Sequence, residues 1–179
     1  RANDPAAAHD LLVETARAHP YPHGDLTDDA WVRAADIDVA RGRYAEAASH
    51  LRELLASREK SDLMGSYERP RYSEAQMKLA EIYRDRLHDD AEARREFHRL
   101  YADFKTSRLR DDALWAEARL ARKDGDEGAA CDAAGRIVHE FPESRYAACA
   151  KLVCPTAPAA EKAHRPCADY IARDFAARK

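Results

Sequence analysis

The stretch DFKTSR at residues 103–108 returns as EFPESR at residues 140–145, a shift of 37 residues. The same shift carries Ala93 onto Ala130. A period of this length between helical patterns is typical of stacked helical repeats, in which each unit buries its apolar face against its neighbours. The repeat therefore favours a binding scaffold over a catalytic site, and it leaves the bound partner unidentified.

The composition favours an all-α protein. The chain has 179 residues, 45% hydrophobic and 35% charged, with a net charge of −3 and only six glycines. Abundant alanine, leucine, arginine and glutamate favour helix, and this length holds one compact domain or one short solenoid. No block of basic residues stands out, which disfavours nucleic acid and anionic lipid as partners. No apolar run is long enough to span a bilayer.

The sequence divides into three expected segments. Residues 1–26 contain a helix at residues 5–18 and a turn whose prolines end that helix. Residues 27–153 contain the repeats. Residues 154–179 contain a disulfide-tied cap with a last helix at about residues 167–177, because the exposed end of a repeat stack needs such a cover for solubility.

The first repeat unit, residues 31–54, shows the alternation of small and large residues that two packed helices require. Small side chains at Ala35 and Ala47 let the helices approach closely, and the large Trp31 fills the gap to the next helix. Gly42 permits the tight turn between the two helices, because glycine readily adopts a positive φ.

Two further units follow. A linker of about residues 57–71 leads to the second unit, residues 72–104, whose turn at residues 87–90 is one residue longer than usual. The third unit, residues 107–142, is weakened by Arg119, which stands where a small residue is expected.

Polar residues mark where helices start. Thr27 or Asp28 is expected to cap the helix that follows the proline-containing turn. Ser107 and Ser144 are expected to act in the same way, and the second of them precedes the first helix of a fourth unit at residues 145–153.

These units resemble tetratricopeptide (TPR) repeats over about residues 28–153. The matching positions are Trp31, Ala35 and Ala47, then Leu79, Ala80, Tyr83 and Ala93, then Trp115, Ala118 and Ala130. The phrase FPESRYA at residues 141–147 is similar to the Phe-Pro-x-Ser-x-x-Ala linker of periplasmic members. Those include the outer-membrane assembly lipoprotein of the β-barrel machinery and the TolA-binding cell-division coordinator. The earlier copy departs from this linker by carrying Lys105 in place of proline.

The resemblance implies an all-α, right-handed α-solenoid of antiparallel helix pairs, a TPR-like superhelix of about nine helices that binds proteins without catalysis. In TPR proteins the first helix of each pair lines the concave surface, which suits an extended peptide or a partner helix. The corresponding positions in this chain are Asp29, Val32, Asp36, Val39, Met77, Glu81, Arg84, Asp85, Ala116, Leu120 and Lys123.

Four cysteines lie in the last third of the chain. An even number at one end fits disulfides in an oxidising compartment, and the alternative is buried free thiols in a cytosolic protein. Cys149 and Cys154 are five residues apart, about 140° around a helix, so they should not bond each other. We expect the pairs Cys131–Cys149 and Cys154–Cys167, with Cys131–Cys154 and Cys149–Cys167 as the rival pairing. The spacing lacks the Cys-x-x-Cys pairs of structural zinc sites.

Other chemistry has weaker support. His19 and His23 flank a Pro-Tyr-Pro turn, where a solvated loop is favoured over a metal site. A paired-carboxylate hydrolase needs two acids converging on one pocket, whereas acids on repeats usually decorate a solvated surface. The candidate acids are Asp36, Asp38, Glu81 and Asp85. We therefore expect no catalytic residues, no metal and no cofactor.

The leading hypothesis is a non-enzymatic scaffold of a bacterial cell envelope, located in the periplasm as a module of a larger machine. Its partners would be other proteins, not nucleic acids or small-molecule substrates. The chain begins at Arg1 without an apolar signal core, so we expect a mature or trimmed chain from which targeting information was removed, and the sequence leaves open a lipid anchor in the full-length protein. The alternatives are an accessory helical domain of a peptidoglycan-acting envelope enzyme and a cytosolic TPR adaptor with free thiols.

Overall fold

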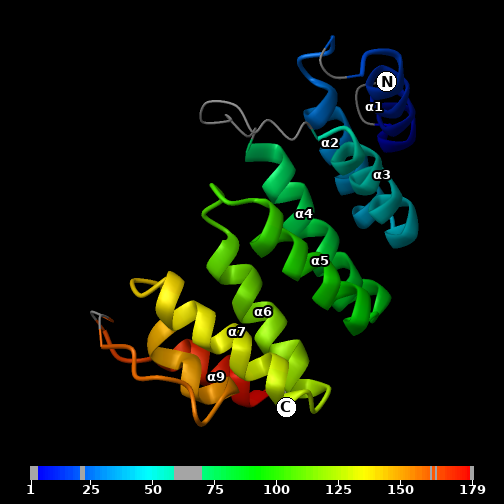
Figure 1. The fold of residues 1–179 in the computed structure, drawn as a ribbon. Coiled ribbons are helices and arrows are strands. Elements are labelled where there is room, and N and C mark those ends of the chain that lie inside the picture. Colours follow the sequence, from blue (N-terminus) through cyan, green and yellow to red (C-terminus); the bar gives the residue numbers. More distant parts are fainter. Residues whose placement is uncertain (1–3, 21–22, 59–69, 162, 164, 178–179) are drawn as a thin grey trace. The chain divides into compact units, whose positions relative to one another are not determined.

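A computed structural model describes residues 4–20, 23–58, 70–161, 163 and 165–177 (Figure 1). Across these residues the regular structure is entirely helical, with nine α-helices, one π-helical turn and one 3-10 turn. The prediction of an all-α protein is therefore confirmed.

The elements follow one another along the chain. They are α1 (Pro5–Ala18), α2 (Thr27–Ala40), α3 (Tyr44–Ala56), α4 (Pro70–Ile82), the π-helix η1 (Tyr83–Leu87), α5 (Asp90–Asp103), α6 (Arg110–Lys123), α7 (Glu127–Glu140), the 3-10 helix η2 (Ala147–Cys149), α8 (Ala150–Val153) and α9 (Asp169–Ala177). Most of the expected linker between α3 and α4 lies outside the described residues.

The helices form two compact units, an N-terminal unit of residues 1–93 and a C-terminal unit of residues 94–179. Consecutive helices pack on one another within each unit: α1 on α2, α2 on α3 and α3 on α4 in the first, and α6 on α7 and α7 on α8 in the second. This serial packing is consistent with a solenoid-like arrangement. The right-handed superhelix stays a prediction.

Each helix pair turns through one residue in the left-handed region. These residues are Gly42 (φ 74°), His88 (φ 54°) and Gly125 (φ 77°). An alanine with no exposed surface follows each of them five positions later: Ala47, Ala93 and Ala130. A left-handed residue, followed five positions later by a buried alanine, thus recurs in all three repeats.

A backbone hydrogen bond closes each turn and shows which residues are equivalent. The bonds run from Arg43 N to Asp38 O (2.8 Å), from Asp89 N to Tyr83 O (2.9 Å) and from Asp126 N to Ala121 O (2.9 Å). The middle bond spans one residue more than the others, and the π-helix η1 holds that extra residue. The longer second turn is explained by this local widening of the helix.

The cap predicted for the helix after the proline-containing turn is placed differently. Thr27 is the first residue of α2, and Leu26 precedes it without a side-chain cap. The Thr27 hydroxyl donates to the carbonyl oxygens of Gly24 (2.9 Å) and His19. The prediction of an N-cap at Thr27 or Asp28 was wrong because this hydroxyl closes the preceding turn.

Ser107 and Ser144 also act one turn earlier than predicted. The Ser107 Oγ accepts from the Leu109 amide (3.1 Å), while α6 begins only at Arg110. The Ser144 Oγ accepts from the Tyr146 amide (3.1 Å) before the 3-10 helix η2. Each serine therefore fixes the turn between repeats, since a serine hydroxyl readily bonds the amide two residues on.

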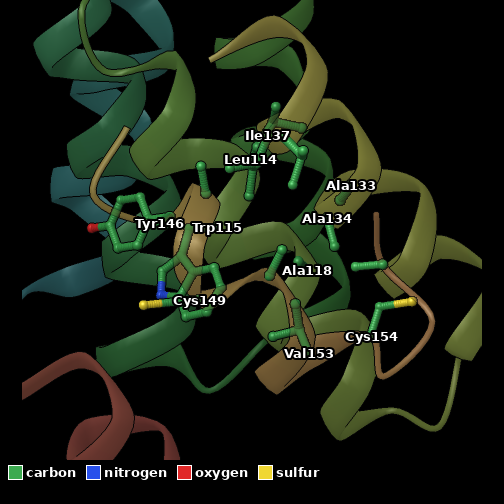
Figure 2. Close-up of a cluster of buried hydrophobic side chains, with 14 of the residues drawn as sticks. Leu114, Trp115, Ala118, Ala133, Ala134, Ile137, Tyr146, Cys149, Val153 and Cys154 are labelled. Atoms are coloured by element: carbon green, nitrogen blue, oxygen red, sulfur yellow. The ribbon is translucent and has the colours of Figure 1, made fainter. Parts of the chain in front are cut away.

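The core of the C-terminal unit joins α6 and α7 to the segment that follows them (Figure 2). Its labelled members are Leu114, Trp115 and Ala118 from α6, Ala133, Ala134 and Ile137 from α7, and Tyr146, Cys149, Val153 and Cys154 from the last part of the chain. Trp115 stacks on Tyr146 with ring centroids 5.0 Å apart, and Ile171 brings α9 into the same cluster. The C-terminal segment therefore covers α6 and α7, as a repeat cap should.

The structure contains the rival disulfide pairing. Cys131 bonds Cys154 and Cys149 bonds Cys167, with Cα atoms 4.9 and 4.7 Å apart. The preferred pairing was wrong because the expected helix at residues 145–153 does not form as one piece: Cys149 ends a 3-10 turn, and only the four residues of α8 follow. The chain after α8 returns Cys154 to α7, and the last helix begins at Asp169 instead of residue 167.

Candidate protein-binding surface

The surface expected to bind partners is partly formed in the N-terminal unit, where α2 and α4 lie side by side. Two ion pairs join these helices. Asp29 Oδ1 lies 2.9 Å from Arg71 Nε, and Asp36 pairs with Lys78. The first helices of two consecutive pairs are therefore neighbours, as in a stack of helix pairs.

Eight of the predicted binding residues lie on this part of the chain. Asp36, Glu81 and Asp85 are exposed, whereas Asp29 and Arg84 are partly exposed. Val39 and Met77 are half-buried, and Val32 is buried at 9% exposure. Val32 therefore belongs to the packing between helices and is a wrong prediction as an exposed residue.

The end of the surface near η1 carries a small charged group. Arg84 binds Asp85 through two hydrogen bonds of 2.8 Å, and Glu81 lies 4.0 Å from the same guanidinium. The side chains of Glu81 and Asp85 are 49% and 43% exposed. Exposed ion pairs of this kind contribute only about 0–1 kcal/mol. A charged partner can therefore break them and form ion pairs of its own at little cost in free energy.

The three predicted residues from the third repeat lie in the other unit. Ala116 and Leu120 are buried, and Lys123 is exposed. The prediction that Ala116 and Leu120 are exposed was wrong. In the same unit Arg119 of α6 pairs with Asp174 of α9.

One predicted surface acid is instead deeply buried. Asp38 has no exposed surface, and its carboxylate contacts His9, His50 and Arg43. The prediction that Asp38 lies on a solvated surface was wrong. Asp38 occupies the position that Tyr83 holds in the second repeat and Ala121 in the third.

The sequence reasoning did not single out His9 or His50. A signal was present in the pattern: a carboxylate at a position where the repeat carries an aromatic or small side chain needs buried partners. Histidines on the flanking helices are the partners that the structure supplies.

The repeated motif itself has a structural role in its second copy. Ser144 donates to Asp111 Oδ2 and the Tyr146 hydroxyl donates to Asp112 Oδ1, both at 2.7 Å. Burial, together with the bond to Asp112, raises the pKa of Tyr146 well above its ordinary value. Residues 144–146 thus fasten the chain after α7 to the first turn of α6, which gives this copy of the motif a role in packing.

Comparison with protein-family models, with curated proteins and with solved structures finds no match. Among the described residues no helix combines the length and apolar character needed to cross a bilayer. The two cysteine pairs at bonding distance suggest an oxidising compartment.

Proposed function

We propose that this chain is a non-enzymatic scaffold that docks other proteins through the α2–α4 surface. The observation that carries the proposal is the pair of adjacent first helices, joined by Asp29–Arg71 and Asp36–Lys78 and bearing exposed charges along its length. Half-buried Val39 and Met77 add apolar area between those charges. This mixture suits a peptide or helix that presents alternating apolar and charged side chains.

The cysteines and the repeated motif support the proposed compartment. The two disulfides favour an oxidising environment and disfavour the cytosolic adaptor. The likeness of residues 141–147 to the linker of periplasmic TPR proteins supports the periplasm of a bacterial envelope, with the chain acting as one module of a larger assembly.

Charge reversal on the surface tests the proposal. The variant Asp36→Lys with Glu81→Lys changes exposed positions on α2 and α4, while Glu46→Lys with Glu53→Lys makes the same change in net charge on exposed positions of α3. The wild type and both variants serve as bait in an envelope extract after mild cross-linking. Dissociation constants are then measured with each captured protein after purification.

We expect a partner that binds the wild type and the α3 variant but is lost from the α2–α4 variant, with its dissociation constant raised at least about tenfold, or about 1.4 kcal/mol. Charge reversal at an interface disfavours the complex by like-charge contact, which is why a large effect is expected. Equal binding by both variants would place the docking site elsewhere.

A further inference from the structure

Three helices of the N-terminal unit converge on one buried carboxylate. Asp38 of α2 places Oδ2 3.2 Å from Nε2 of His9 on α1 and 3.0 Å from Nδ1 of His50 on α3. The two histidine side chains are each 11% exposed, and their ring centroids are 5.3 Å apart. The candidate ligand atoms of His9, Asp38 and His50 all lie within 4.8 Å of one another.

His9 has an arrangement that calls for a cation. Its Nδ1 lies 3.0 Å from Asp10 Oδ1, and its Nε2 faces Asp38 Oδ2. A neutral imidazole carries one N–H, so one of the two nitrogens would direct a lone pair at a carboxylate oxygen. A metal ion between His9 and Asp38 would remove that repulsion.

The donor set matches a transition metal. Imidazole nitrogens and one carboxylate oxygen are ligands that Zn²⁺ accepts at about 2.0–2.2 Å, a spacing that places neighbouring ligand atoms a little over 3 Å apart. A metal-bound histidine usually donates its other N–H to a carboxylate, which is the part Asp10 plays for His9. His50 is held in place by Trp31, whose ring centroid is 5.2 Å away.

His9 borders the surface of the unit, whereas Arg43 occupies the far side of the carboxylate. His9 also lines an open depression on the outer side of α1, together with Val13 and Arg17. Arg43 lies in ion-pair contact with the other carboxylate oxygen, Asp38 Oδ1, without the geometry of a hydrogen bond. Oδ2 therefore remains the oxygen that faces both histidines.

We propose that His9, Asp38 and His50 bind one divalent transition-metal ion of the zinc type, which fastens α1 to the hairpin of α2 and α3. The ion would complete the first repeat by joining the helix that precedes it. This site is separate from the α2–α4 surface and from the disulfides. The proposed metal site therefore does not depend on the proposed docking function.

The test uses the full chain with its disulfides intact, without a polyhistidine tag and after removal of metal by a chelator. Zn²⁺ is titrated in calorimetry, and Co²⁺ is used as a spectroscopic probe of the same site. The variants are His9→Gln, His50→Gln and Asp10→Ala. The matched control is His98→Gln, which removes a more exposed histidine that also contacts a carboxylate, Glu117, at 3.1 Å.

We expect one Zn²⁺ per chain with a dissociation constant in the micromolar range or below, and a thermal midpoint that rises with zinc. His9→Gln and His50→Gln should each weaken binding at least about tenfold, and Asp10→Ala by about tenfold, as for other outer partners of metal-bound histidines. His98→Gln should bind as the wild type does.

Three results would overturn the metal site. These are millimolar or weaker zinc binding, unchanged binding in the double variant His9→Gln with His50→Gln, and an equal loss in His98→Gln. Asp10 is 82% exposed, so Asp10→Ala keeps the test decisive even if a variant of the buried His50 fails to fold.

Discussion

Single alanines set how closely the two helices of each pair approach. Ala47 has no exposed surface and lies where α3 packs on α2, whereas Ala45, two residues earlier on the same helix, is exposed. We expect Ala47→Leu to lower the free energy of unfolding by about 1–3 kcal/mol, because extra methylene groups in a packed core force side chains and backbone apart. Urea denaturation measures the change.

The matched variant Ala45→Leu adds the same volume at an exposed site, where substitutions usually change stability by less than about 0.5 kcal/mol. An equal loss of stability in the two variants would show that a small residue at Ala47 is not needed for the helices to approach closely.

A second single-residue effect depends on pH. The Glu117 side chain is 15% exposed, and burial raises the pKa of its carboxyl above the ordinary value, although the His98 ring opposes this. A raised pKa in the folded state means that stability is greatest when the carboxyl is protonated and falls as the pH rises through that value. Glu117→Gln removes the charge and should be more stable than the wild type at pH 8, by urea denaturation.

At pH 4, below the ordinary pKa of the side chain, the stability advantage of Glu117→Gln should largely disappear because the wild-type carboxyl is then mostly protonated. An equal difference between the two proteins at pH 8 and pH 4 would show that packing, not charge burial, separates them.

The turn between helices is the element that distinguishes the second repeat. His88 adopts φ 54° at the position where the other repeats have Gly42 and Gly125. A side chain in this conformation costs about 1–2 kcal/mol, and part of that is offset because glycine loses more chain entropy on folding. We expect His88→Gly to stabilise the chain by about 0.5–1 kcal/mol, measured by thermal or urea unfolding.

The reverse change provides the control. An added Cβ at Gly42 would meet nothing within 4 Å, so Gly42→Ala tests the backbone conformation without a steric clash. It should cost about 1 kcal/mol. A destabilising His88→Gly would mean that the imidazole contributes more through its contacts than the left-handed backbone costs.

Taken as a molecule, the chain is stabilised differently at its two ends. The two disulfides are confined to the C-terminal unit, where they tie Cys131 of α7 to Cys154 after α8 and Cys149 of η2 to Cys167 just before α9, through sequence separations of 23 and 18 residues. Closing loops of this size contributes about 3 kcal/mol each in the chain-entropy account. Reduction should therefore speed amide hydrogen exchange in α7 and α9 and leave exchange in α2 and α3 unchanged.

Peptide mapping without reductant should yield Cys131 linked to Cys154 and Cys149 linked to Cys167, with no free thiol detected. Uniform loss of protection over both units after reduction would show that the chain unfolds as one cooperative body. Recovery of the pairing Cys131–Cys149 would contradict the arrangement of the segment after α7.

Local patterns predicted much of the fold. The first helix spans residues 5–18 as expected, and Gly42 turns the first pair as its position predicted. These features depend on neighbours only a few residues apart, where periodicity and backbone preference act. Even local inference failed at Thr27, because its hydroxyl can either cap a helix or close a turn, and the contact with His19 favours the turn.

The sequence alone therefore determined the helices, the turns and the small residues between helices, because each depends on residues only a few positions apart. The disulfides and the contact of His9 with Asp38 join positions far apart in the chain, and His9 and Asp38 are separated by 29 residues. The burial of Leu120 likewise depends on how helices pack. Such contacts depend on where a helix starts and how it packs, and the interruption of the expected helix at residues 145–153 accompanies the rival cysteine pairing. They could be known only once the helices were placed in three dimensions.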